Sequence, residues 1–115
     1  MTAKKPRAPG HLQPPTRSWW AAVAADYQLE AHHFRLLQLA GEAWDRGEQA
    51  REALGKDGLT VTDDRGNVRA HPLLAVERDC RTAFARLVRE LDLDTEAPPS
   101  SRIGPRNLAS NGGRR

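Results

Sequence analysis

Apolar residues recur at helical spacing in three stretches of the chain, and this pattern predicts three helices. The first helix is expected to follow the pair Pro14-Pro15, where either Thr16 or Ser18 can cap its start. Its apolar positions are Trp19, Trp20, Val23 and Tyr27. They give this helix one side that is suited to packing against a neighbour.

The second helix is expected to run from about Glu30 to about Leu54. One of its stripes alternates steps of three and four residues and consists of Leu37, Ala40, Trp44, Gly47, Arg51 and Leu54. The sequence Lys56-Asp57-Gly58 predicts its end, because Gly readily takes the left-handed position that closes many helices. Gly41 and Gly47 each cost about 1 kcal/mol inside a helix relative to Ala. Either a close approach between helices or simple tolerance explains them.

The third helix is predicted to begin at Pro72, because the missing N–H of proline would have no partner at a first helical position. Its apolar face consists of Leu73, Val76, Cys80, Phe84, Leu87 and Leu91. Its reverse side carries Arg78, Arg81, Arg86 and Arg89. The pairs Glu77 with Arg81 and Arg86 with Glu90 are four residues apart, so a solvated, self-neutralised surface is the alternative to a binding surface.

Between the second and third helices the sequence predicts a β-hairpin. Residues 58–72 read GLTVTDDRGNVRAHP, in which Asp63-Asp64-Arg65-Gly66 suits a type I turn with Asp first and Gly last. One face of the two strands is expected to carry Leu59, Val61, Val68 and Ala70. An isolated two-stranded hairpin is marginally stable in water, so this one is expected to contact the helices or a neighbouring chain.

Composition divides the chain into a body and two tails. Both ends are rich in basic residues, Pro and Gly, and are expected to bury too little apolar surface to fold. The sequence therefore predicts a mainly α protein with three helices, one β-hairpin between the second and third, and disordered basic tails. The expected parts are a flexible N-terminal arm over residues 1–15, a helical oligomerisation core over 16–93 with its hairpin at 58–71, and a flexible C-terminal tail over 94–115.

The charge of the chain follows the same division. The net charge of +3 comes from the tails, since acids outnumber bases between residues 18 and 93. Basic tails on a mildly acidic body favour contact with a phosphate backbone or an acidic partner, although solubilising tails explain the same charges. A folded body of roughly 75 residues is marginally stable alone, so self-association is expected.

The sequence contains no recognisable catalytic, cofactor or metal motif. It has no phosphate-binding loop, dinucleotide fingerprint or paired-cysteine motif, so we predict a protein that is not an enzyme and uses no cofactor and no metal. His32 and His33 are adjacent, so their rings diverge on a helix and cannot chelate one ion. Cys80 is interpreted as a small core residue. The single cysteine and the absence of a long apolar run predict a soluble protein of a reducing compartment.

Residues 58–93 read GLTVTDDRGNVRAHPLLAVERDCRTAFARLVRELDL. This stretch combines a Gly-led hairpin, an Arg-x-His-Pro junction ending at Pro72, a Glu-Arg-Asp starting at Glu77 and a closing Arg-Leu-Val-Arg-Glu-Leu. It resembles the signature of the phage terminase small subunit family, in the short form found in tailed double-stranded-DNA phages. The earlier stretch from His11 through Trp44, with its Pro-Pro pair and double Trp, also fits that family.

The resemblance implies a role in genome packaging. Small terminases of this kind assemble as rings, bind viral DNA and recruit or regulate the large subunit, which holds the ATPase and nuclease. The implied partners are further copies of the chain, double-stranded DNA and the large terminase subunit, with no membrane. The implied location is the cytoplasm of the infected or lysogenic bacterial host. Two other classes stay open, a small oligomeric DNA-binding regulator and a structural adaptor with protein-binding tails.

Three sets of residues are the candidates for these contacts. The DNA-binding candidates are Lys4, Lys5, Arg7, Arg17, Arg65, Arg69, Arg78, Arg81, Arg86 and Arg89. The oligomer or core candidates are Leu37, Trp44, Leu54, Val61, Val68, Val76, Phe84 and Leu87. The candidates for docking on the large subunit mix apolar and basic residues of the C-terminal tail and are Arg102, Ile103, Arg106 and Leu108.

Overall fold

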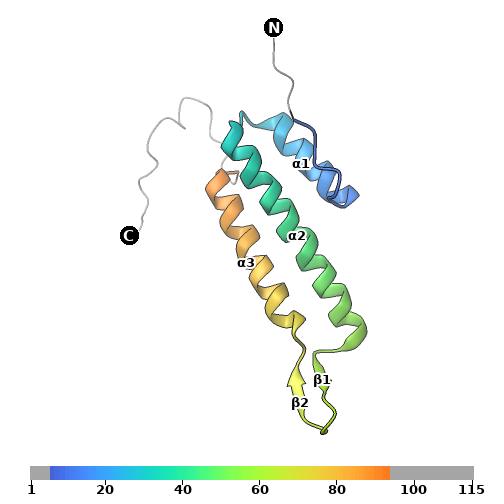
Figure 1. Cartoon of the computed structure of the whole chain (residues 1–115). Helices are drawn as coiled ribbons and strands as arrows, with labels where there is room; N and C mark the ends of the chain where they lie inside the picture. The colour runs from blue at the N-terminus through green and yellow to red at the C-terminus, as the bar shows by residue number, and fades with distance from the viewer. Residues whose placement is uncertain (1–5, 94–115) are drawn as a thin grey trace, which may run out of the picture.

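Three helices and one hairpin make up the described part of the chain, residues 6–93, in the computed structural model (Figure 1). The order along the chain is α1 (Pro14–Asp26), α2 (Ala31–Asp57), β1 (Thr60–Thr62), β2 (Val68–Ala70) and α3 (Leu73–Leu91). The predicted mainly α fold with a hairpin between the second and third helices is confirmed. The predicted tails at residues 1–5 and 94–115 lie outside the described residues.

Helices α2 and α3 form an antiparallel pair, and the hairpin projects from the end of this pair where α2 finishes and α3 begins (Figure 1). Helix α1 lies against the other half of α2 (Figure 1). The Tyr27 hydroxyl, just beyond α1, donates a hydrogen bond to the Leu93 carbonyl at 2.9 Å. This bond ties the end of α1 to the end of α3.

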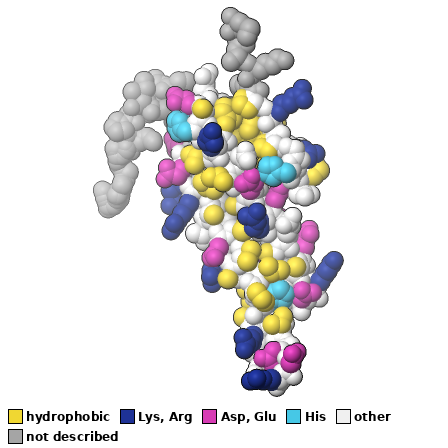
Figure 2. Space-filling model, in the orientation of Figure 1, with side chains coloured by type: hydrophobic (Ala, Val, Ile, Leu, Met, Phe, Trp, Pro, Cys, Tyr) yellow, Lys and Arg dark blue, Asp and Glu magenta, His cyan; other side chains and the backbone are white. Residues whose placement is uncertain are grey.

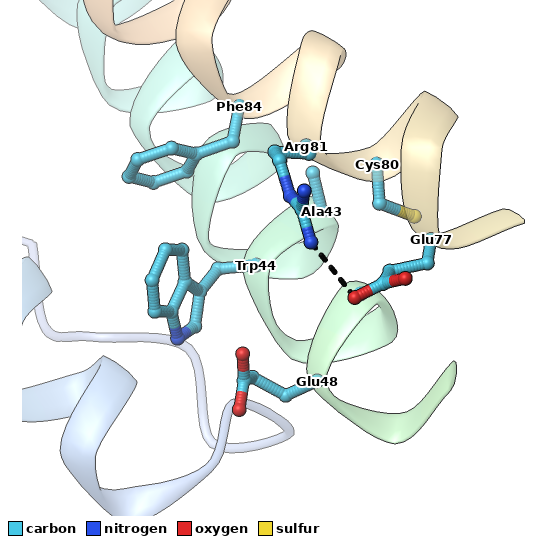
Figure 3. A pocket seen from close by; sticks show the side chains of 8 residues that line it. Ala43, Trp44, Glu48, Glu77, Cys80, Arg81 and Phe84 are labelled. Carbon is cyan, nitrogen blue, oxygen red and sulfur yellow. Dashed lines mark hydrogen bonds and ion pairs between the residues drawn. The ribbon is translucent and has the colours of Figure 1, made fainter. Parts of the chain in front are cut away.

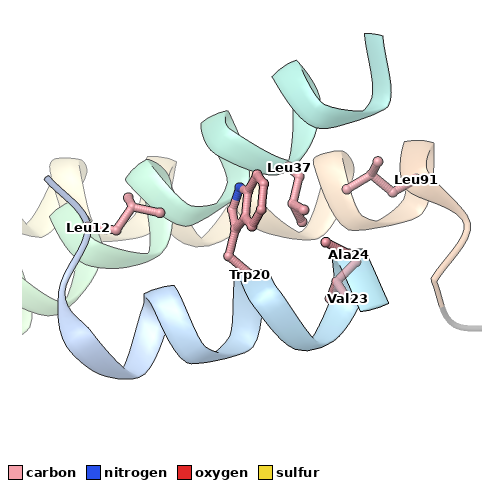
Figure 4. Packing of buried hydrophobic residues seen from close by; sticks show 6 residues of the cluster. All are labelled: Leu12, Trp20, Val23, Ala24, Leu37 and Leu91. Atoms are coloured by element: carbon pink, nitrogen blue, oxygen red, sulfur yellow. The ribbon is translucent and has the colours of Figure 1, made fainter. Parts of the chain in front are cut away.

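The buried core lies where α1 meets the helical pair, at the end away from the hairpin. Its main cluster consists of Leu12, Trp20, Val23, Ala24, Leu37 and Leu91 (Figure 4), and Ala40, Ala50 and Leu54 of α2 are buried as well. Leu12 is only 2% exposed although it precedes α1. The folded body therefore extends further toward the N-terminus than the predicted boundary at residue 16. The reason is that the Leu12 side chain packs into the apolar cluster between the helices.

The start of α1 differs from the prediction. Neither Thr16 nor Ser18 caps the helix; Gln13 is the N-cap, and Pro14 begins the helix. The cap is supplied by α2 instead, because the Asp45 carboxylate accepts the Gln13 backbone N–H at 2.8 Å and the Thr16 hydroxyl at 2.5 Å. A sequence rule for local caps cannot find an acceptor that lies about 30 residues away.

Helix α2 ends at Asp57, as the Lys56-Asp57-Gly58 sequence predicted; Gly58 has a positive φ of 83°, but its ψ of 176° is extended, so it does not take the expected left-handed helical conformation. Gly41 and Gly47 of α2 mark close approaches, which decides between the two explanations that the sequence left open for them. A Cβ on Gly41 would lie 3.0 Å from Leu12 Cδ1, and one on Gly47 would lie 3.2 Å from Cys80 Cβ. Gly47 therefore lets α2 and α3 approach each other closely at Cys80.

The hairpin forms as predicted, but its faces differ from the prediction. Thr60 pairs with Ala70, Val61 with Arg69, and Thr62 with Val68. Because paired residues point to the same side of a sheet, Val61 shares a face with Arg69 and not with Val68 or Ala70. The predicted apolar face was wrong because it ignored this register. Gly66 has a φ of 82° and its N–H donates to the Asp63 carbonyl, so the predicted turn is confirmed.

The junction between hairpin and α3 is built around His71. Pro72 has helical dihedral angles but is the N-cap, so α3 begins one residue later than predicted. The buried His71 ring accepts the Leu73 backbone N–H at Nδ1 and lies 3.0 Å from the Asp57 carboxylate at Nε2. Since Nδ1 is an acceptor, Nε2 carries the proton and donates to Asp57. One imidazole thus joins the end of α2 to the start of α3.

Candidate functional site

The described residues offer no metal centre. Among residues 6–93 no group of three or more His, Cys, Asp and Glu side chains could hold a metal ion. Within the same part of the chain, no helix is long and apolar enough to cross a membrane. The surfaces that remain to be considered are the arginines and an aromatic groove.

The four arginines on the reverse side of α3 are all exposed. Arg81 pairs with Glu77 at 2.8 Å, as its spacing predicted, and Arg78 lies 3.3 Å from Asp79. The second predicted pair, Arg86 with Glu90, does not form an ion pair in the described part of the chain. Within residues 6–93, Arg86 and Arg89 therefore have no carboxylate partner, whereas Arg78 and Arg81 are neutralised as on a solvated helix surface.

Two more candidate cations lie in the hairpin. Arg65 is exposed in the turn, and Arg69 lies 3.6 Å from the Asp63 carboxylate. Asp63 also accepts the backbone N–H groups of Asn67 and Arg65, each at 2.9 Å. These hydrogen bonds, with that of Asn67 the largest cause, hold the pKa of Asp63 below its usual value. Asp63 therefore organises the turn and partly neutralises Arg69.

Two candidate cations near the N-terminus, Arg7 and Arg17, differ in their exposure and contacts. Arg7 is exposed, whereas Arg17 is half-buried and its guanidinium donates to the Leu12 carbonyl at 2.6 Å. Arg17 thus holds the segment before α1 in place, a role that its charge alone did not indicate. Lys4 and Lys5 lie outside the described residues, as do the docking candidates Arg102, Ile103, Arg106 and Leu108.

Basic side chains are spread over the visible face of the molecule rather than gathered into one patch. In Figure 2 they lie along both long edges, at separate points within the face and at the hairpin tip, with acidic side chains between them. Interspersed charge of this kind is typical of a solvated surface. Contact with a polyanion through this face would rely on several copies or on the edges, not on one continuous cationic area.

An aromatic groove lies where the three helices meet. It has a volume of about 430 Å³ and is lined by Pro15, Thr16, Trp19, Trp44 and Phe84. The Phe84 ring lies 5.0 Å from the Trp44 ring and 5.6 Å from the Trp19 ring, measured between centroids. Trp44 is 48% exposed, so it is not part of the buried core of a single chain.

A second hollow adjoins the groove and shares Trp44 and Phe84 with it. This hollow has a volume of about 220 Å³ and is lined by Ala43, Trp44, Gly47, Glu48, Glu77, Cys80, Arg81 and Phe84 (Figure 3). The Glu77 and Arg81 ion pair lies at its edge (Figure 3). Together the two hollows leave the Trp44 and Phe84 rings accessible along one side of the helical pair.

A family model described as phage terminase, small subunit, matches residues 17–105 of the 115-residue chain. The chain belongs to the phage terminase small subunit family. The resemblance seen in the sequence is thereby confirmed, and membership implies a role in phage DNA packaging. Searches of curated proteins and of solved structures found no match.

In this terminase small subunit, the candidate oligomer or core residues divide by exposure. Leu37 and Leu54 are buried within the chain, and Val61, Val76, Phe84 and Leu87 are half-buried. Trp44 and Val68 are exposed, so the described part of the chain does not bury these two side chains. Sequence reasoning missed Pro15 and Trp19 as partners of Trp44. The adjacent pair Trp19-Trp20 was the available signal, because neighbouring residues on a helix point in different directions.

Proposed function

We propose that this chain assembles as a ring, binds viral DNA and recruits or regulates the large terminase subunit during genome packaging. The observation that carries the proposal is the family match over residues 17–105, which includes α1 from its fourth residue onward and the whole of α2, the hairpin and α3. The aromatic groove supports self-association, since aromatic side chains such as its Trp44, Trp19 and Phe84 are enriched at protein interfaces.

Among the described residues, Arg86 and Arg89 are candidates for DNA contact, as are the exposed Arg7 and Arg65. Arg86 and Arg89 are exposed on α3, while Arg81 and Arg69 have carboxylates within 4 Å and Arg17 donates to a carbonyl. An arginine without a carboxylate partner does not have to give up an ion pair in order to reach a phosphate. Arg7, with Lys4 and Lys5, remains the proposed N-terminal contact.

DNA binding is tested by fluorescence anisotropy with double-stranded DNA over a series of salt concentrations. The Arg86→Gln, Arg89→Gln double variant is expected to bind more weakly, and the slope of log K against log salt is expected to fall by about 1 for each phosphate that the protein no longer neutralises. The matched control is Arg51→Gln, since Arg51 is already paired with Glu48 at 2.8 Å. Equally weakened binding in both variants would mean that the α3 arginines have no special role.

The two tails are proposed to divide the remaining contacts. Deleting residues 1–5 should weaken DNA binding and reduce its salt dependence, because it removes Lys4 and Lys5. Deleting residues 97–115 should leave DNA binding largely intact and abolish stimulation of the large subunit's ATPase, because this segment carries Ile103 and Leu108 among its arginines. The opposite pattern would reverse the assignment of the tails.

Two other functions predict different results in the same experiments. A dimeric DNA-binding regulator would show a two-chain mass and a defined half-site, with no effect on the large subunit. A structural adaptor would show no salt-dependent DNA binding, because that dependence arises from phosphate neutralisation. Native mass with and without DNA separates these from a ring.

A further inference from the structure

The structure contains two exposed surfaces without charge that cannot reach each other within one chain. The first is the aromatic groove of Pro15, Thr16, Trp19, Trp44 and Phe84. The second is the uncharged hairpin face, defined as Thr60, Thr62, Val68 and Ala70, which lie on one side of the sheet because Thr60 pairs with Ala70 and Thr62 with Val68. All four are exposed, and Val68 is 67% exposed.

The two surfaces lie at different places along the molecule. The hairpin projects from one end of the α2 and α3 pair, while α1, which supplies Pro15 and Trp19, packs against the other half of α2 (Figure 1). Thirteen residues of α2 separate Trp44 from Asp57 at the hairpin end, a rise of about 20 Å at 1.5 Å per residue. The hairpin of one chain therefore cannot cover the groove of the same chain.

We propose that the uncharged hairpin face of one copy docks into the aromatic groove of the next copy, in a head-to-tail contact. This inference rests on the proposed ring, and it names the two surfaces that meet. Each chain offers one hairpin and one groove, so the contact is heterologous and either closes a ring or grows a filament. A two-stranded hairpin is marginally stable alone, and the groove of a neighbour would give it the support that its exposed face lacks.

The two surfaces are compatible in charge. Neither the groove lining nor the uncharged hairpin face includes an ionisable side chain, so docking buries no unpaired charge, as is usual at the centre of an interface. Charged groups lie beside both surfaces. The hollow next to the groove is lined by two carboxylates, Glu48 and Glu77, and one guanidinium, Arg81. Both carboxylates already have an arginine partner within the chain, Arg51 for Glu48 and Arg81 for Glu77, so this side of the groove carries no unpaired acid either.

The test uses two single variants of the full chain and native mass spectrometry. Val68→Glu places a charge on the uncharged hairpin face, and Trp44→Ala removes an indole ring from the lining of the groove. Each variant alone is expected to fall from the wild-type ring to the single-chain mass of 12.8 kDa. The matched control is Leu39→Glu on α2, because Leu39 is another exposed large apolar residue outside both surfaces, and it should keep the ring.

Mixing the two variants gives the decisive measurement. A Val68→Glu chain still has an intact groove, and a Trp44→Ala chain still has an intact hairpin, so an equimolar mixture should form dimers of one of each and nothing larger. A mixture that stays monomeric would overturn the head-to-tail contact. Disassembly of Trp44→Ala but not of Val68→Glu would also overturn it, in favour of a contact between two grooves.

The result also separates this inference from the proposed ring. A wild-type chain that is a ring, together with variants that remain rings, refutes the contact and leaves the proposed function in place. A wild-type chain that is a monomer under all conditions refutes both. Circular dichroism of Val68→Glu and Trp44→Ala checks folding, and if Trp44→Ala is unfolded, Trp19→Ala replaces it as the groove variant.

Discussion

His71 donates a hydrogen bond from Nε2 to the Asp57 carboxylate, with the two atoms 3.0 Å apart, and so connects the start of α3 to the end of α2. The same ring accepts the Leu73 backbone N–H at 3.1 Å, and the His71 backbone N–H donates to the Leu59 carbonyl at 2.8 Å. Three elements, α2, the hairpin and α3, therefore meet at one buried residue.

Replacing His71 by Ala is expected to destabilise the fold by about 1–3 kcal/mol, since it removes two side-chain hydrogen bonds, to the Asp57 carboxylate and from the Leu73 N–H, each contributing about 0.5–1.5 kcal/mol. Urea denaturation followed by circular dichroism, at one protein concentration, measures the destabilisation. The control is His32→Ala, because His32 is exposed and lies 3.9 Å from its nearest carboxylate. Equal stability of the two variants would show that the His71 bonds contribute little.

Replacing Asp45 by Ala is expected to loosen α1 from α2. Two donors would be left without their acceptor, the Gln13 N–H and the buried Thr16 hydroxyl, at a cost of about 1–3 kcal/mol. Relative to the wild-type chain, amide hydrogen exchange in the variant should become faster in α1 and change less in α3. Glu52→Ala is the control, an exposed acid on the same helix, and it should leave α1 unchanged.

Replacing Gly66 by Val is expected to strain the hairpin turn by about 1–3 kcal/mol, because a β-branched residue disfavours the positive φ found there. Assembly should be reduced more than helix content, as measured by native mass and circular dichroism. Gly55→Ala is the control within α2, where a Cβ meets nothing within 4 Å. Unchanged assembly in Gly66→Val would argue against a role for the hairpin in self-association.

Stability is expected to fall as the pH drops from about 5 to about 3, near the usual carboxyl pKa values. Hydrogen bonds from Gln38 and then His11 lower the pKa of Glu42, and those of Asn67 lower that of Asp63. A carboxyl with a lowered pKa stabilises the fold above its unfolded-state pKa, and this contribution is lost as the pH falls through its folded-state value.

Thermal midpoints measured across this pH range test the expectation. Asp63→Asn should flatten the pH dependence, because the amide retains an acceptor oxygen but does not titrate there. Asp64→Asn, in the same turn, is the control. A profile that Asp63→Asn leaves unchanged would assign the acid sensitivity to other groups.

The element order was predictable from the sequence because each helix has a local pattern. Pro72, the apolar spacing from Leu73 and the stop at Gly58 are all readable from a few neighbouring residues. The burial of Leu12 and the cap by Asp45 were not predictable, because both depend on contacts between residues about 30 positions apart.

The candidate site was only partly predictable for the same reason. Helical spacing placed Trp44 and Phe84 on stripes of their own helices, but it could not show that the packing leaves Trp44 half exposed beside Trp19. Helical spacing also predicted an ion pair between Arg86 and Glu90, which the structure does not contain. Spacing tells which side chains share a face, whereas exposure and pairing depend on how the faces meet.

The hydrogen bond from the Tyr27 hydroxyl to the Leu93 carbonyl fixes the end of α3 beside the end of α1. Leu93, the last described residue, is held at the end of α3 opposite the hairpin, and α3 has 19 residues, a length of about 28 Å. In any assembly with cyclic symmetry, equivalent atoms lie on one circle around the axis. The Leu93 residues of all copies would therefore lie on one circle, so a single partner on the axis would be at the same distance from each of them.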